Sequence, residues 1–94
     1  MKVLWTASAV AQLQSINDYI AQTSPEYAMR IIDRLTRRSI QIAAFPFSGR
    51  IVPESERDDV REVIEGLYRI IYLVESTQVQ VVAVIHGARE WPRF

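Results

Sequence analysis

The sequence contains no cysteine, a single histidine and a single lysine. Without cysteine, the chain has neither a disulfide framework nor thiolate chemistry. No apolar run approaches the ~20 residues that a membrane-spanning helix needs, and the first residues lack the extended apolar region of a secretory signal. We therefore expect a cytoplasmic protein that makes no use of the membrane.

The chain also lacks an excess of either charge. Its 11 basic and 11 acidic residues cancel at neutral pH, and this balance argues against direct, diffuse binding of nucleic acid. Every basic residue except Lys2 is an arginine, whose planar guanidinium favours specific contacts with carboxylates, phosphates and ring faces. Ninety-four residues have room for one hydrophobic core, so we expect residues 1–94 to form a single domain.

Two amphipathic helices are predicted in the first half of the chain. A short apolar strand at residues 3–5 is followed by Thr6-Ala7-Ser8, which predicts a helix cap. Apolar residues then recur at three- and four-residue spacing between positions 10 and 20. Ser24-Pro25 starts a second helix, because serine is a favoured N-cap and proline is favoured at the first helical position, and Pro46 ends it. Few residues separate the helices, which should therefore pack as an antiparallel hairpin.

The second half is rich in β-forming residues. Short breaks, such as Gly66, separate the runs and suit hairpins, so these strands should form an antiparallel meander that the strand at 3–5 joins at an edge or beside the last strand. The predicted fold class is α+β, in the order β-α-α-β-β-β, with the helical hairpin on one face of a twisted, mainly antiparallel four-stranded sheet. The three runs are residues 60–65, 68–75 and 79–86.

Several short motifs occur in a fixed order along the whole chain. They are Trp5-Thr6, Tyr19-Ile20-Ala21, Ser24-Pro25, Pro46-x-x-Gly49-Arg50, Arg61-Glu62, Tyr68-Arg69-Ile70-Ile71-Tyr72 and Val84-Ile85-His86-Gly87-Ala88-Arg89. Each motif alone is weak. Together, and in this order, they resemble the ParE/RelE family of toxins from bacterial type II toxin-antitoxin systems.

The resemblance implies a small toxin that is held inactive by a partly disordered antitoxin, which folds onto it in a hetero-oligomer. RelE-like members cleave mRNA in the ribosomal A site, whereas ParE-like members act on DNA gyrase. We predict a ParE-like gyrase inhibitor that is not an enzyme. A RelE-like, ribosome-dependent endoribonuclease is the alternative, and a degenerate, non-toxic member that still binds its antitoxin is the third possibility.

The choice between the two branches depends on missing groups. The RelE pattern implies two lysines, which fall here on Val60 and Glu62, and a tyrosine in a C-terminal extension for which no residue remains. Only Arg69 and Arg89 match, and two cations without an acid or a base make a poor nuclease. We expect this pair to serve protein recognition or a fold-stabilising contact with Glu62 or Glu90. The acidic loop at residues 54–59 would also repel an RNA backbone.

His86, the only histidine, has two interpretations. In a ribonuclease it would be the general acid or base and would act with Arg69 and Arg89 as the catalytic residues. In the structural interpretation it ends the last strand and bonds to a backbone carbonyl, while Gly87 permits a turn that aims Arg89 and Trp91 outward. We favour the structural interpretation, because no motif places a tyrosine, lysine or glutamate beside this histidine.

Two sets of binding residues are predicted. The segment after Gly87 alternates arginine with aromatic residues, which are enriched at binding hot spots, and we expect it to bind the target while mattering little to folding. Tyr68 and Tyr72 share one face of a strand, which either packs on the helices or receives the antitoxin. The target-binding candidates are Arg69, Arg89, Trp91, Arg93 and Phe94, and the antitoxin-binding candidates are Tyr68, Tyr72 and Arg61.

No cofactor site is apparent in the sequence. The chain has no cluster of His, Cys, Asp and Glu with metal-ligand spacing and no glycine-rich phosphate loop. We therefore expect no metal and no cofactor, and a function that depends on contacts with other proteins.

Overall fold

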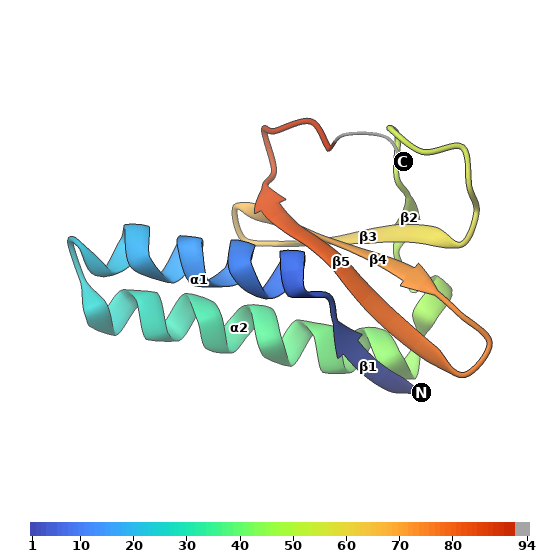
Figure 1. Ribbon diagram of the computed structural model, residues 1–94, viewed down its shortest axis with the longest axis horizontal. Helices are drawn as coiled ribbons and strands as arrows, with labels where there is room; N and C mark the ends of the chain where they lie inside the picture. The colour runs from blue at the N-terminus through green and yellow to red at the C-terminus, as the bar shows by residue number, and fades with distance from the viewer. Residues whose placement is uncertain (92–94) are drawn as a thin grey trace.

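Two antiparallel helices lie on one face of a five-stranded sheet in the computed structural model, which describes residues 1–91 (Figure 1). This arrangement confirms the predicted α+β class. The elements are β1 (Lys2–Trp5), α1 (Ala7–Ala21), α2 (Pro25–Ala44), the 3-10 helix η1 (Pro46–Ser48), β2 (Arg50–Ile51), β3 (Val60–Glu65), β4 (Tyr68–Val74) and β5 (Gln78–His86).

The strands follow the order β1-β5-β4-β3-β2 across the sheet. β1 runs parallel to β5 and the other neighbours are antiparallel, so the first strand lies both at an edge and beside the last strand. The prediction of four strands was wrong by one, because β2 pairs with β3 at the opposite edge. With two residues, β2 is too short to show the alternation by which a strand is recognised in a sequence.

Side-chain caps start both helices. The Thr6 hydroxyl accepts a hydrogen bond from the Ala9 amide at 3.1 Å, and the Ser24 hydroxyl accepts one from the Tyr27 amide at 3.2 Å. The predicted starts are therefore confirmed. The predicted apolar stripe of α1 was misplaced at its first residue, because Val10 is 51% exposed and the fully buried residue of this turn is Ala9.

A β-bulge divides β5 into two halves. Val81 pairs with Tyr72 and Ala83 pairs with Ile71, so that Val82 is an extra residue without a partner in β4. The extra residue reverses which side chains face the helices. Both Val81 and Val84 consequently belong to the core on the helical side, although simple alternation would place them on opposite faces.

The face of the sheet away from the helices carries a second apolar cluster. Figure 1 shows that the loop after β2 and the segment after β5 both lie on this side. Trp91 packs here and is 8% exposed, so the expectation that it points outward was wrong, and truncation before this residue would remove part of a core. The buried members of the cluster are Val52, Val60, Ile71, Ala83, Ile85 and Trp91.

Tyr72 fastens the segment between α2 and β2 to the sheet. Its side chain is fully buried among core residues on the helical side, and its hydroxyl donates to the Pro46 carbonyl at 2.7 Å. The same hydroxyl accepts from the Gly49 amide at 3.2 Å. Tyr68 and Tyr72 do share a face, and that face packs on the helices. Tyr72 is therefore inaccessible to an antitoxin in this conformation, which corrects its assignment as a binding residue.

We predict that Tyr72→Phe destabilises the protein by roughly 2 kcal/mol, because it leaves the Gly49 amide and the Pro46 carbonyl without their partner. Urea unfolding measures the change, which should appear in the midpoint and not in the slope. Tyr19→Phe is the matched control, since Tyr19 is 75% exposed and should tolerate the loss of its hydroxyl. Equal midpoints for the two variants would contradict the assignment.

Candidate functional site

A buried ion-pair network occupies the face of the sheet away from the helices. Arg69 on β4 is 5% exposed, and its guanidinium lies between two carboxylates. Its Nε donates to Glu62 at 2.7 Å, while its two terminal nitrogens each donate to Glu54 at 2.8 Å. This bidentate pairing uses the planar fork of arginine, which lysine could not reproduce.

The network also holds the chain after β5. The Arg69 Nη1 donates to the carbonyl of Arg89 at 2.9 Å, and the Glu54 carboxylate accepts from the Trp91 amide at 2.8 Å. Glu62, which is fully buried, pairs in addition with Arg50 of the edge strand β2. The same few charges therefore join β2, β3, β4, the loop after β2 and the C-terminal segment 87–91.

Hydrogen bonds keep Glu54 and Arg69 charged. The bonds from Arg69, and then the bond from the Trp91 amide, lower the pKa of Glu54 from 4.5 to about 2. The bond to Glu54, and to a lesser extent the bond to Glu62, raise the pKa of Arg69. Glu54 thus remains a carboxylate down to strongly acidic pH.

These contacts revise the predicted role of Arg69. Its guanidinium is buried and engaged by two carboxylates and a carbonyl, so it is not presented to a target. The alternative expectation, a fold-stabilising contact with Glu62, is confirmed. Glu54 was missed as a partner, because nothing in the sequence shows that the acidic loop folds back over β4.

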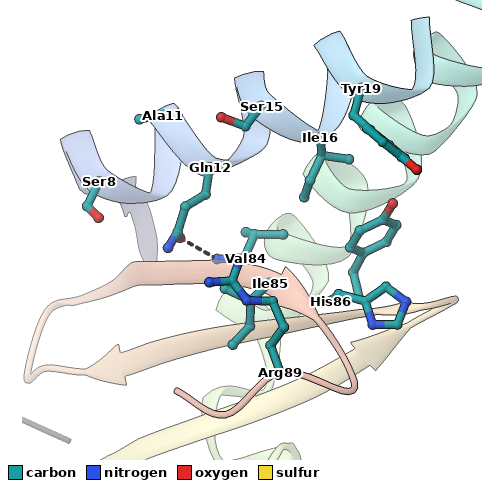
Figure 2. A pocket seen from close by; sticks show the side chains of 11 residues that line it. Ser8, Ala11, Gln12, Ser15, Ile16, Tyr19, Val84, Ile85, His86 and Arg89 are labelled. Atoms are coloured by element: carbon teal, nitrogen blue, oxygen red, sulfur yellow. Dashed lines mark hydrogen bonds between the residues drawn. The ribbon is translucent and has the colours of Figure 1, made fainter. Parts of the chain in front are cut away.

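A groove of about 670 Å³ lies between α1 and the second half of β5, and we call it the α1–β5 groove (Figure 2). Because β1 ends at Trp5, this part of β5 has β4 on one side and no neighbouring strand on the other. Gln12 occupies that place, with its side-chain oxygen accepting from the Val84 amide at 2.9 Å. The groove is lined by Ser8, Ala11, Gln12, Ser15, Ile16, Tyr19, Tyr68, Val84, Ile85, His86 and Arg89.

His86 ends β5, as predicted, and borders this groove. Its Nδ1 accepts from the Ala88 amide at 3.1 Å, so the imidazole bonds to a backbone amide and not to the expected carbonyl. Its ring meets Tyr68 edge-on with 6.0 Å between centroids. Gly87 does not adopt a positive φ, which corrects the reason given for it, but a Cβ there would lie 3.3 Å from the Leu67 carbonyl oxygen.

The remaining candidates differ in accessibility. Arg89 is exposed, and its side chain makes no hydrogen bond or ion pair within residues 1–91; Figure 2 shows it reaching over the end of β5. Arg61 donates to the carbonyls of Asp58 and Gly49, at 2.7 and 3.1 Å, and lies over the Phe47 ring. The target-binding candidates Arg93 and Phe94 fall outside the described residues.

A smaller apolar pocket, of about 250 Å³, adjoins the groove where the helices meet the turn between β3 and β4. Tyr19 and Tyr68 line both cavities. Tyr19, Tyr27 and Leu67 are large side chains left exposed around this pocket. Sequence reasoning did not single them out as binding residues, although Tyr19 and Tyr27 fall outside the periodic apolar stripes and Leu67 stands in a turn.

Neither a metal site nor a membrane-spanning helix is found in the described part of the chain. Within residues 1–91, no group of three or more His, Cys, Asp and Glu residues could hold a metal ion. None of the helices described is long and apolar enough to cross a membrane.

Comparisons with known proteins identify the class. Residues 3–91 match the family described as the ParE toxin of the parDE type II toxin-antitoxin system. Over 88 residues the chain is 36% identical to Toxin RelE2 of Caulobacter vibrioides, covering 94% of this chain and 97% of that protein. The fold resembles that in a structure of the chromosomal ParDE TA system from P. aeruginosa, with a TM-score of 0.74 and 24% identity over 92% of this chain and 95% of that one.

The chain is therefore a toxin of the type II toxin-antitoxin class. Within that class it belongs to the ParE toxin family, whose match spans nearly its whole length. The resemblance proposed from the sequence motifs is confirmed. The relative named RelE2 nevertheless carries the name of the other branch.

We predict that stability falls in acid as Glu54 takes up a proton. Because its pKa is lowered from 4.5 to about 2, its contribution is complete above about pH 4.5 and disappears as the pH falls to about 2. Its size is roughly 2 to 3 kcal/mol. Thermal unfolding of wild type and Glu54→Gln should show a difference at pH 7 that shrinks across this window.

Asp58→Asn is the control for this measurement, since Asp58 is an exposed carboxylate of the same loop whose side chain makes no hydrogen bond or ion pair within residues 1–91. A constant difference between wild type and Glu54→Gln from pH 7 to pH 2 would refute the role of the charge.

Proposed function

We propose that this ParE-family toxin inhibits DNA gyrase and does not cleave RNA. The observation that carries the proposal is the burial of Arg69. A nuclease of the RelE pattern needs this cation at the scissile phosphate, whereas here two carboxylates neutralise it on the face of the sheet away from the α1–β5 groove. Contacts with a protein target need no such group.

The strand that precedes Arg69 supports the same proposal. The positions at which the RelE pattern places lysines hold Val60 and Glu62, and both side chains are fully buried. Val60 packs in the second apolar cluster, and Glu62 pairs with Arg50 and Arg69. This strand therefore offers no cation to an RNA backbone at those two positions.

One observation favours the ribonuclease as a second candidate. His86, Arg89, Tyr19 and Tyr68 line the same groove, which brings a possible general base, a cation and two hydroxyls to one surface. A relative with 36% identity is named RelE2. In this alternative His86 would deprotonate the attacking hydroxyl and Arg89 would contact the phosphate.

The proposed antitoxin site is the α1–β5 groove together with the adjoining apolar pocket. Tyr19, Tyr68 and Leu67 present a large apolar surface there, which an amphipathic segment of a partner could cover. Tyr68 is therefore proposed as an antitoxin-binding residue, as predicted from the sequence, together with Tyr19 and Leu67. Arg61 lies toward the opposite edge of the sheet, near β2 and Phe47, and would require a second contact by the same partner.

We predict that the purified toxin inhibits supercoiling of plasmid DNA by gyrase and leaves mRNA intact in a translating extract. Arg89→Ala should weaken inhibition about tenfold or more, because arginine is prominent among interface hot spots. Supercoiling gels and primer extension measure the two activities. Codon-positioned cleavage that is lost in His86→Ala, with unaffected supercoiling, would replace this proposal by the ribonuclease.

We predict that Tyr19→Lys weakens binding of the cognate antitoxin at least tenfold without lowering the melting temperature of the free toxin. Tyr19 is 75% exposed, so the change costs little in folding but places a charge in the apolar surface. Met29→Lys on α2 is the matched control, at 71% exposure and outside both cavities. Titration calorimetry measures the affinities, and equal affinities for the two variants would place the antitoxin elsewhere.

A further inference from the structure

The backbone around Arg89 is fixed at three points. The Arg89 amide donates to the His86 carbonyl at 3.0 Å, and the Arg89 carbonyl accepts from Arg69 at 2.9 Å. The Trp91 amide donates to Glu54 at 2.8 Å. The peptide units on both sides of Arg89 are thus held, while its guanidinium is left exposed beside the groove.

We propose that Glu54 is a positioning residue for Arg89. Through Arg69 and the Trp91 amide, Glu54 holds the C-terminal segment so that the Arg89 guanidinium is presented to a carboxylate of the protein target. This proposal rests on the proposed function, in which Arg89 contacts the target. A cation whose backbone is already ordered loses less conformational freedom on binding than one on a mobile tail.

Among the charges of the network, Glu54 is the one whose replacement should disturb the position of Arg89 without unfolding the sheet. Glu62 holds Arg69 from β3, and removal of Arg69 would leave the fully buried Glu62 without its main partner. The side chain of Glu54 is 19% exposed, and it is the carboxylate that receives both the Arg69 fork and the Trp91 amide. Replacing it should release the C-terminal segment while β3 and β4 remain joined through Glu62.

The test compares Glu54→Ala with Asp58→Ala in the full chain. Asp58 is an exposed carboxylate of the same loop, so its variant controls for lost charge. Gyrase supercoiling gives the concentration for half inhibition, and amide hydrogen exchange reports on the backbone. Glu54→Ala should inhibit about tenfold more weakly. Its Trp91 amide should be accelerated in exchange by a factor about ten times larger than the Ile70 amide in β4, whose acceleration reports only the loss of overall stability. Asp58→Ala should behave as wild type in all three measurements.

A double variant separates positioning from general destabilisation. Glu54→Ala should have no further effect on inhibition in an Arg89→Ala background, since both changes remove the same contact. Equal effects in the two backgrounds would overturn the proposal. Where Arg89→Ala does weaken inhibition, faster exchange at Trp91 with undiminished inhibition in Glu54→Ala would overturn it as well. If Glu54→Ala does not fold, Glu54→Gln takes its place in the same comparison.

Failure of the proposed function gives a different result. An Arg89→Ala variant that inhibits gyrase as well as wild type would remove Arg89 from the target contact. The exchange rate of the Trp91 amide in Glu54→Ala would then still decide whether Glu54 positions the segment: an unchanged rate would overturn the positioning role, and an accelerated rate would support it.

Discussion

The guanidinium of Arg69, enclosed by Glu54 and Glu62, is the interaction on which the far face of the sheet depends. Three charges buried together are costly unless each is fully bonded, and here every nitrogen of the fork has a carboxylate or carbonyl partner. Loss of Arg69 or Glu62 would leave a buried charge without its main partner, whereas the side chain of Glu54 is partly exposed. The bonds of Glu54 and Arg69 make the loop after β2 and the C-terminal segment parts of one cooperative unit.

The two faces of the sheet differ in the interactions that stabilise them. On the helical side, apolar packing dominates and leaves a groove with exposed tyrosines. On the other side, a smaller apolar cluster is closed by ion pairs and by Trp91. Arg89 links the two sides, because its carbonyl is bound by the network and its side chain borders the groove.

The sequence predicts most of the fold, since caps and periodicity are local signals. Thr6, Ser24 and the strand limit at His86 were all recognisable from neighbouring residues. The site was predicted less well, because it depends on contacts between residues far apart in the chain. The pairing of Arg69 with Glu54 joins positions 15 residues apart, and Glu54 lies in a loop without a regular pattern. Burial of Trp91 was missed for the same reason: its partners lie on several different elements.

The extra residue Val82 has a consequence for how related chains are compared. Loss of one residue at this point would restore regular alternation and rotate the end of β5 by half a turn. The side chain at the position of His86 would then face the ion-pair network, and its neighbour would enter the groove. Two toxins that differ here by a single insertion or deletion would thus present different chemistry at equivalent backbone positions. A gap near Val82 in an alignment of two such toxins would therefore change every side chain that the end of β5 presents to the groove, whereas a substitution at His86 changes one.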